Sequence, residues 1–502
     1  MPDYKNLFDS TTKPKIGADQ ANRLVVLDSY KKIFRLAYPV VLVNAVDTVM
    51  MMVDRLFLSR FGEGAEGGIL LGGSMGGAVI TLLAQAPVMG LLLYTNAIAS
   101  QNFGRKDLPR CAQVVTQAMY WAILYYPLML FFSRFVPAAL EWMKHDPALA
   151  GAEWQYSRVL IGGAVFALLR LPLNSFFIAS NRSGLVMKVS FIGMALNIPL
   201  DYWFIFDVPL LPGLFEGFGL GARGLRPGDL GLPTGIAGAA AATVVAQFLT
   251  FSLLMLLFLR QKREYRIREA WRFRPNIHRE MLRFGLPASL EGFLTVFSFN
   301  AFLMLLYSIS PLVAAAGTIT FSWDLCNFTL LMGIGTATTT LVGRSLGAGD
   351  VAMARHFTKL ILGAALAFSG FISLWFIFAP DLLSRAFIPE GTANQEALLD
   401  MSRTMLRLAT FYLLADALGM VMRGALTGAG DTFAVMLIAV SMHFLLLAGT
   451  LIMLKVLGLG AIPIWTFFVV FVLVCNGAFV LRYATGHWAK HWARESPKYA
   501  RD

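Results

Sequence analysis

Twelve apolar stretches constrain the fold of this 502-residue chain, because each is long enough to cross a lipid bilayer. A helix needs about 20 apolar residues to span the hydrocarbon core, where its backbone must satisfy its own hydrogen bonds. No stretch shows the alternation of apolar and polar residues that is typical of membrane barrels. We therefore predict an all-α integral membrane protein with twelve transmembrane helices, at residues 34–58, 69–97, 113–136, 155–180, 184–206, 235–260, 285–308, 314–341, 357–379, 404–427, 433–456 and 461–483.

The composition supports this class of protein and disfavours a nucleic-acid binder. Hydrophobic residues make up 57% of the chain and charged residues 14%, whereas an average soluble domain is about 25% charged. The net charge is +12, but the basic residues lie beside the apolar stretches, which favours contact with anionic lipid headgroups. Three scattered cysteines, Cys111, Cys326 and Cys475, match no metal or redox spacing. We expect membrane lipids as partners, no nucleic acid, a monomer and no bound cofactor.

One connection is both long and strongly basic, and it sets the predicted topology. The segment Arg260–Glu280 follows the sixth stretch and carries eight arginines and lysines. The positive-inside rule places this segment in the cytoplasm. Because six stretches precede it and six follow it, both termini are predicted to be cytoplasmic. The loops predicted on the other side carry acids, namely Glu63, Glu66, Asp381 and Glu390. We expect a multi-pass protein of the plasma membrane, which is the inner membrane in a bacterium.

The chain also repeats itself. RLAYP at Arg35–Pro39 returns as RFGLP at Arg283–Pro287, and ASQNFGRKD at Ala99–Asp107 returns as VGRSLGAGD at Val342–Asp350. Each match occupies the same place in its six-helix half, so we predict two pseudo-symmetric six-helix lobes with a site between them. The predicted organisation is an N-terminal cytoplasmic tail at 1–32, an amino lobe at 33–260, a basic cytoplasmic linker at 261–283, a carboxyl lobe at 284–484 and a C-terminal cytoplasmic tail at 485–502.

Four aspartates lie inside the predicted helices, at Asp47, Asp54, Asp201 and Asp416. A carboxylate at the centre of an inserted helix costs about 2.5–3.5 kcal/mol, so such residues normally face a polar cavity, a partner or an ion. Asp47 and Asp54 are seven residues apart and share one helix face. Asn197 and Asp201, four residues apart, also share a face. If these two helices meet, three carboxylates line one pocket.

Five motifs, spread along the chain in a fixed order, resemble those of one transporter family. YPVVLVNAVDTVMMMVDRLFLSRFG is similar to the first helix of that family, NIPLD (Asn197–Asp201) to its fifth-helix element and GIAGAAAATVVAQ (Gly235–Gln247) to its sixth helix. TLVGRSLGAGD (Thr340–Asp350) and ADALGMVMRGALTGAGD (Ala415–Asp431) resemble signatures of its second half. Over residues 30–485 the chain thus resembles the MATE (multidrug and toxic compound extrusion) transporters.

The resemblance implies a fold, a function and a set of site residues. MATE transporters have twelve helices in two six-helix lobes, and they export bulky, often cationic and amphipathic compounds, driven by inward flow of protons or sodium ions. Matched residue by residue, the ion-binding positions of the amino lobe fall on Asp54, Asn197, Asp201 and Thr243. In the carboxyl lobe, Tyr412 and Asp416 fall on matching positions of the tenth helix.

Departures from the family pattern leave the roles of three further acids open. Some members carry a seventh-helix glutamate where this chain has Thr295; Glu291, one turn earlier on the same face, is expected either to replace that glutamate or to serve separately. Asp47 stands where many relatives carry an uncharged amide. Asp324 is expected either to attract a cationic substrate or to bond to neighbouring Ser or Asn side chains.

The acids suit either of two coupling ions. Repulsion and desolvation oppose the simultaneous ionisation of neighbouring carboxylates, so such a group can take up and release protons near neutral pH. Alternatively, the oxygens of Asn197 and Thr243 complete a site for Na⁺. We favour protons, because Asp47 adds a third acid and Thr295 removes a charged ligand. The structural alternative pairs these carboxylates with arginines or uses them to cap broken helices.

The sequence predicts a secondary active exporter of organic compounds, not an enzyme. It contains no HExxH motif, nucleophile elbow or phosphate-binding GKS/GKT loop, and its GAGDTFA segment follows no strand. One alternative is a lipid-linked oligosaccharide flippase of the same superfamily, whose cavity is expected to be basic. A second is an integral-membrane lipid enzyme, which requires a nucleophile or a metal cluster. A non-transporting receptor would leave the buried acids without a purpose.

Overall fold

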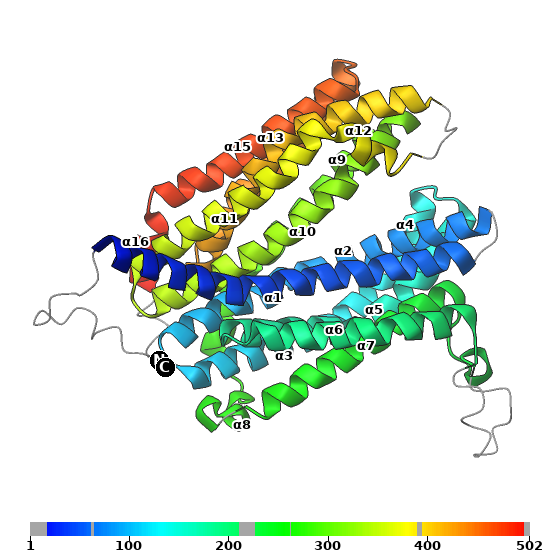
Figure 1. The fold of residues 1–502 in the computed structure, drawn as a ribbon. Helices are drawn as coiled ribbons and strands as arrows, with labels where there is room; N and C mark the ends of the chain where they lie inside the picture. The colour runs from blue at the N-terminus through cyan, green and yellow to red at the C-terminus, as the bar shows by residue number, and fades with distance from the viewer. Residues whose placement is uncertain (1–17, 62–64, 210–225, 262, 389–393, 496–502) are drawn as a thin grey trace, which may run out of the picture.

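The computed structural model describes residues 18–61, 65–209, 226–261, 263–388 and 394–495, and these residues form helices and their connections (Figure 1). The prediction of twelve transmembrane helices is confirmed, because twelve described helices are long and apolar enough to cross a bilayer. They are α1 (Ala18–Phe61), α2 (Ala65–Gly104), α3 (Leu108–Ser133), α5 (Pro147–Ala179), α6 (Ser183–Phe206), α7 (Gly235–Leu259), α9 (Pro275–Tyr307), α10 (Pro311–Gly347), α11 (Val351–Phe378), α13 (Gln395–Gly428), α14 (Thr432–Leu451, extended by a π-helical turn at Ile452–Val456) and α15 (Ala461–Ala484). The short helices are α4 (Val136–Trp142), α8 (Ile267–Ala270), α12 (Pro380–Arg385) and α16 (His487–Glu495).

The sequence repeat marks a helix boundary in each lobe. Lys106 and Gly349 occupy the same place in the repeat, and both have a positive φ, 65° and 80°, which turns the chain out of the preceding helix. Each repeat then ends in an aspartate that caps the next helix: Asp107 accepts a hydrogen bond from the backbone of Arg110, and Asp350 from that of Met353. Such a cap satisfies a backbone N–H that the first helical turn leaves without a partner.

The basic linker is folded against the amino lobe. Its backbone carbonyls at Ala270 and Trp271 accept hydrogen bonds from Thr116 and Tyr120 of α3. α9 begins at Pro275, inside the segment 261–283 that the sequence assigned to the linker. The tails at 1–17 and 496–502 lie outside the described residues, as do Glu63, Lys262 and Glu390 of the topology argument.

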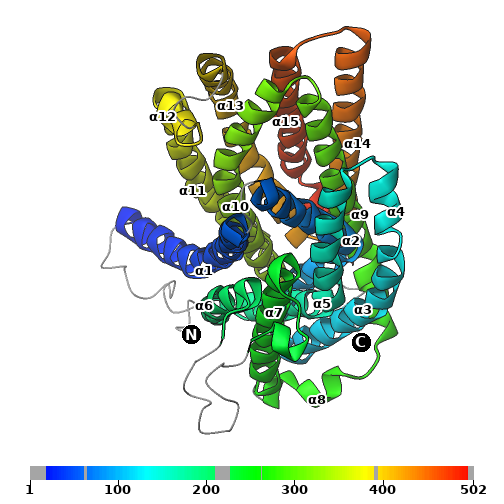
Figure 2. The same cartoon turned by 90° about the vertical axis from the view of Figure 1, so that its right-hand side faces the viewer.

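The helices form two lobes that meet at one end and diverge toward the other. In Figure 1 the start of α1, α8 and α16 lie at the left-hand end, where the lobes converge, while α4 and α12 lie at the right-hand end. Figure 2 shows α10, α11, α13, α14 and α15 in the upper half and α3, α5, α6 and α7 in the lower half, with α1 and α2 between them. The elements nearest the two termini thus share an end with the linker, as the predicted topology requires.

A crossing of α2 and α10 holds the lobes together at the linker end. Gln101 donates to the carbonyl of Gly428 at the end of α13, 2.9 Å away. Arg344, its counterpart in the repeat, donates to the carbonyls of Ile178 and Ala179 at the end of α5, at 2.6 and 3.1 Å. Each lobe therefore uses a side chain of its second helix to satisfy carbonyls at the end of the fourth helix in the other lobe, carbonyls that a helix cannot pair internally.

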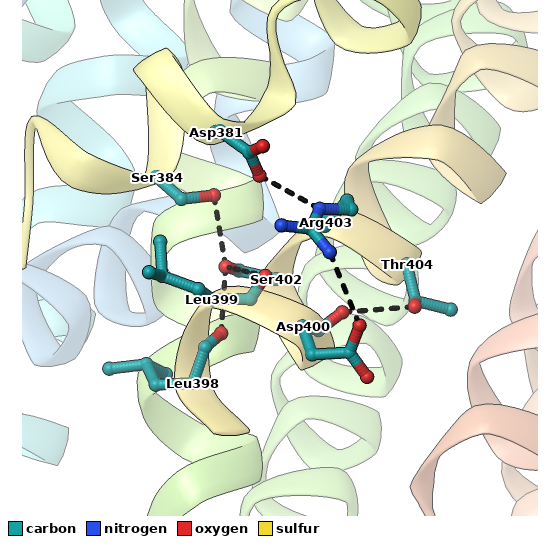
Figure 3. A network of polar contacts seen from close by, with 8 residues as sticks. All are labelled: Asp381, Ser384, Leu398, Leu399, Asp400, Ser402, Arg403 and Thr404. Atoms are coloured by element: carbon teal, nitrogen blue, oxygen red, sulfur yellow. Dashed lines mark hydrogen bonds and ion pairs between the residues drawn. The ribbon is translucent and has the colours of Figure 1, made fainter. Parts of the chain in front are cut away.

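The outer end of the carboxyl lobe is fixed within that lobe by polar contacts between α12 and α13 (Figure 3). Ser402 donates to Ser384 at 2.9 Å, and Arg403 donates to Asp381 at 2.8 Å. The Arg403 hydrogen bond holds the pKa of the exposed Asp381 carboxyl below its ordinary value. Trp323 of α10 adds a bond to the carbonyl of Leu383 at 3.0 Å. These contacts position α12 on its own lobe.

Candidate functional site

A cavity of about 370 Å³ lies inside the amino lobe. Its walls come from α1, α2, α5, α6 and α7, so it is formed by one six-helix half. The residues lining it combine acids, an arginine, amides, hydroxyls and apolar groups: Asp47, Met50, Met51, Asp54, Ala78, Thr81, Leu82, Gln85, Tyr156, Leu160, Arg170, Ser190, Thr243, Ala246, Gln247 and Thr250. The cavity is therefore amphipathic, which suits a guest with both apolar and charged parts.

Four residues predicted to bind the coupling ion form one cluster, and two of them, Asp54 and Thr243, line this cavity. The carboxyl groups of Asp54 on α1 and Asp201 on α6 lie within hydrogen-bonding reach of each other. Thr243 of α7 donates to Asp54 at 3.0 Å, and Asn197 donates to Asp201 at 3.3 Å from one turn earlier on α6. Asp54, Asn197 and Asp201 are all buried. Three helices thus deliver their polar groups to one point.

The oxygens of this cluster are only partly satisfied by the described residues. Oδ1 of Asp54, Oδ2 of Asp201 and Oδ1 of Asn197 are buried and have no hydrogen-bond donor among them. Tyr156 of α5 and Arg55, the residue after Asp54, are near enough to Asp54 to interact with it. Two carboxylates that face each other repel unless a proton or another cation lies between them. A proton or another small cation between these two carboxyl groups would remove that repulsion.

Asp47, predicted to share this pocket, does line the cavity, but it has a partner of its own. Both of its oxygens face the terminal nitrogens of Arg170 on α5, at 3.4 and 3.3 Å. The alternative that a carboxylate in the helices pairs with an arginine is therefore correct for Asp47. Asp54 and Asp201 form no ion pair within the described residues. The three acids are therefore not equivalent: two face each other, and the third faces a guanidinium.

A second polar cluster lies in the carboxyl lobe. Asp416 of α13 accepts a hydrogen bond at 2.9 Å from Asn476 of α15. Tyr412, one turn earlier on α13, is buried, and its hydroxyl lies beside the carboxyl of Asp324 on α10. The structure therefore brings Tyr412, Asp416 and Asp324 to one place, separate from the amino-lobe site. Asp324 thus lies beside a tyrosine, and among the described residues it has no hydrogen bond to the Ser or Asn side chains that the sequence suggested.

Glu291 forms an ion pair with Arg423 of α13. This pairing means that Glu291 is not a free acid in the carboxyl lobe. It also occupies Arg423, which lies seven residues beyond Asp416 on the same helix. The buried hydroxyl of Thr295 has no partner among the described residues. Glu291, like Asp47, is therefore paired with an arginine.

The sequence indicated the acidic residues of the two clusters, but not the side chains that pair with them. Arg170 carried a signal, since it is a charged residue inside the fourth predicted helix, but its partner lies on the first helix. Tyr156 and Asn476 carried no such signal in the sequence. Uncharged polar side chains are common in these helices, and only packing shows which of them face an acid. Their positions opposite Asp54 and Asp416 follow from how each lobe assembles.

Comparisons with known proteins agree with the repeat. The family model MatE matches the chain twice, at residues 39–203 and 287–451. The two matches begin at Pro39 and Pro287, the prolines that end RLAYP and RFGLP. The internal repeat is therefore confirmed.

Relatives resemble the chain over nearly its whole length. A probable multidrug resistance protein NorM from Bradyrhizobium diazoefficiens is 26% identical over 94% of this chain and 96% of its own. Multidrug resistance protein MdtK from Pectobacterium atrosepticum is 26% identical over 84% of this chain and 86% of its own.

Solved structures share the fold. The eukaryotic MATE transporter AtDTX14 matches with a TM-score of 0.77 at 17% identity, covering 94% of this chain and 99% of its own. A MOP superfamily transporter from Pyrococcus furiosus, described as having a binding pocket of reverse polarity, also matches with a TM-score of 0.77 at 17% identity, covering 92% and 96%. The fold alone therefore does not select a substrate, whereas the family match spans both halves of the sequence. The chain belongs to the MatE family, and its twelve helices have the two-lobed arrangement of the MATE transporters.

Proposed function

We propose that this protein is a secondary active exporter that couples the inward flow of protons to the efflux of bulky, amphipathic and often cationic organic compounds. The observation that carries this proposal is the facing pair Asp54 and Asp201, whose remaining oxygens have no donor among the described residues. The relatives named as multidrug resistance proteins support the substrate class. Acidic side chains in the cavity attract cationic substrates. They repel the anionic headgroup of the substrate that a lipid-linked oligosaccharide flippase transports.

The lobes supply the conformational change. They meet at the linker end and diverge at the other (Figure 1), which, with the linker in the cytoplasm, is the outward-facing arrangement of the lobes. A proton entering from outside neutralises one carboxylate of the Asp54–Asp201 pair and removes the repulsion between the two, which lie on α1 and α6. Binding shifts the balance between outward and inward states only if the two states bind the proton unequally. The cluster spans three helices, Asp54 on α1, Asp201 on α6 and Thr243 on α7, so a rearrangement of these helices changes proton affinity.

Protons rather than sodium are our choice of coupling ion. Two carboxylates in direct contact share one proton without further ligands, whereas a bound metal cation needs several oxygens arranged around it. Asn197 and Thr243 each direct a donor, not an oxygen lone pair, at an aspartate. That arrangement stabilises a carboxylate that titrates, and Asn197 Oδ1 has no hydrogen-bond partner among the described residues.

Transport in vesicles tests this proposal directly. Purified protein reconstituted in sodium-free vesicles should move a fluorescent organic cation against its gradient when a pH gradient is imposed, and should stop when an ionophore dissipates that gradient. Empty vesicles of the same lipid serve as the control. A requirement for sodium, with no response to the pH gradient, would contradict the proton assignment while leaving the exporter intact.

Orientation in the membrane is a separate part of the proposal. Arg268 in α8 of the linker and Asp229 in the connection before α7 are both exposed. α8 and the start of α7 lie at opposite ends of the fold (Figure 1). In a Cys326→Ser background, an impermeant maleimide added to whole cells should label Asp229→Cys but label Arg268→Cys only after the cells are opened. The remaining cysteines, Cys111 and Cys475, are buried. Labelling of Arg268→Cys in intact cells would reverse the predicted topology.

A further inference from the structure

Arg170 is a cation on the wall of a cavity that otherwise suits cations. It lies on α5, and its side chain is 15% exposed, opposite Asp47 of α1, whose side chain is 45% exposed. Both residues line the amino-lobe cavity together with Asp54. A cavity that recognises plain cations gains nothing from a guanidinium, since like charges repel. The arginine therefore needs an explanation that the coupling site does not supply.

The contact between Arg170 and Asp47 is a loose one. Two nitrogens of Arg170 face two oxygens of Asp47 at 3.4 and 3.3 Å, whereas charge-assisted hydrogen bonds are normally about 2.7–2.9 Å long. The Nε of Arg170 is buried and has no acceptor among the described residues. The more exposed Asp47 can turn away, while the less exposed Arg170 remains at the cavity wall with two N–H groups to donate.

A planar guanidinium is suited to bind a carboxylate through two parallel hydrogen bonds. A guest carboxylate can therefore replace Asp47 on Arg170. The released Asp47 is then free to pair with a cationic group on the same guest, so the exchange leaves no charge without a partner. Met50, Met51 and Leu82 provide apolar walls for the rest of such a guest. Methionine side chains adapt to varied shapes.

We propose that Arg170 and Asp47 together form a recognition site for zwitterionic substrates, in which a carboxylate lies close to a cationic group, and that Arg170 distinguishes these compounds from plain cations. This inference rests on the proposed export function and names a substrate class for it. The alternative is that the pair only braces α1 against α5, in which case its loss affects all substrates alike.

A matched pair of dyes separates these two readings. A rhodamine with a free carboxyl group is a zwitterion, and its methyl ester is a cation of nearly the same size and fluorescence. We expect wild-type protein in vesicles under a pH gradient to transport both dyes. Arg170→Gln should transport the free acid roughly 10- to 100-fold less well, as expected for losing a charged hydrogen-bond pair, and should transport the ester within about twofold of wild type. Arg158→Gln, an exposed arginine of the same helix outside the cavity, should change neither dye.

Each other outcome overturns the proposal in a recognisable way. Equal loss of both dyes in Arg170→Gln identifies the pair as a brace, and an unchanged acid rate removes Arg170 from recognition. A wild-type protein that exports the ester but not the acid refutes the zwitterion site and leaves the exporter standing, whereas one that exports neither dye refutes both. If Arg170→Gln does not reach the membrane, Arg170→Lys keeps the charge but not the planar fork. It should lose the acid selectively by about tenfold, and an equal effect on both dyes would contradict the proposal.

Discussion

Replacing Asp201 with asparagine should abolish proton-driven export while leaving the protein folded in the membrane. The amide keeps the oxygen that accepts from Asn197 and adds a permanent donor toward Asp54, so the buried cluster stays hydrogen-bonded. It cannot release a proton, however, and so it mimics the protonated state at every pH. Coupling free energies of about 1–3 kcal/mol correspond to roughly 5- to 150-fold effects. Gradient-driven dye accumulation should therefore fall by about tenfold or more.

Asp54→Asn should have the same effect, because the proton belongs to the pair and not to either residue. The matched control is Asp207→Asn at the end of α6, where the aspartate accepts from the backbone of Gly228 outside the cavity. That variant should transport normally. Wild-type accumulation in both Asp54→Asn and Asp201→Asn would remove the amino-lobe pair from the coupling mechanism.

Gly347→Val should open the linker end of the protein. A Cβ atom at Gly347 would lie 1.9 Å from the backbone carbonyl of Gln101, and one at its repeat counterpart Gly104 would lie 2.1 Å from that of Arg344. Neither carbonyl can move without its helix, so the larger side chain must separate α2 from α10. Overpacking costs about 1–3 kcal/mol, and only the state in which these helices touch bears this cost. The population of that state should fall roughly 5- to 150-fold relative to the alternative.

Spin labels at Lys106 and Ala352, exposed positions on opposite lobes at this end, report the change as a distance. Pulsed electron paramagnetic resonance should show a longer distance for Gly347→Val. Transport measured in vesicles should fall with it, since the inward-closed state is now rarely populated. Gly363→Val on α11 is the control, because a Cβ there meets nothing within 4 Å. An unchanged distance distribution in Gly347→Val would show that the α2–α10 crossing does not set the conformation.

The large features of the fold were readable from the sequence because a bilayer imposes them. Apolar length predicted the twelve helices, and the repeated RLAYP and RFGLP segments predicted the two lobes. The contact between Asp54 and Asp201 was also within reach, since each acid shares a helix face with another polar group and unpaired acids in lipid must be brought together. The bilayer acts on every residue of a membrane-spanning helix, so the requirement for apolar side chains is visible in the sequence.

The partners of the acids were not readable, for a physical reason. Asp47 can face either Asp201 or Arg170, depending on the rotation of α1 and on which helix lies across the cavity. Both are determined only when the six helices of the lobe pack together. Glu291 finds Arg423 in the same way, across α9 and α13. The docked linker was missed because its anchors are backbone carbonyls, such as that of Ala270, which no residue type announces.

Simultaneous recording of proton and substrate movement tests the central claim most directly. Vesicles containing the protein, loaded with a fluorescent organic cation and a pH indicator but given no pH gradient, should move protons in the direction opposite to the cation as it leaves. Asp201→Asn should abolish the proton movement, because the facing pair can no longer exchange a proton. Cation efflux without any proton movement in the wild-type protein, or proton movement that persists in Asp201→Asn, would contradict the assignment of Asp54 and Asp201 as the coupling site.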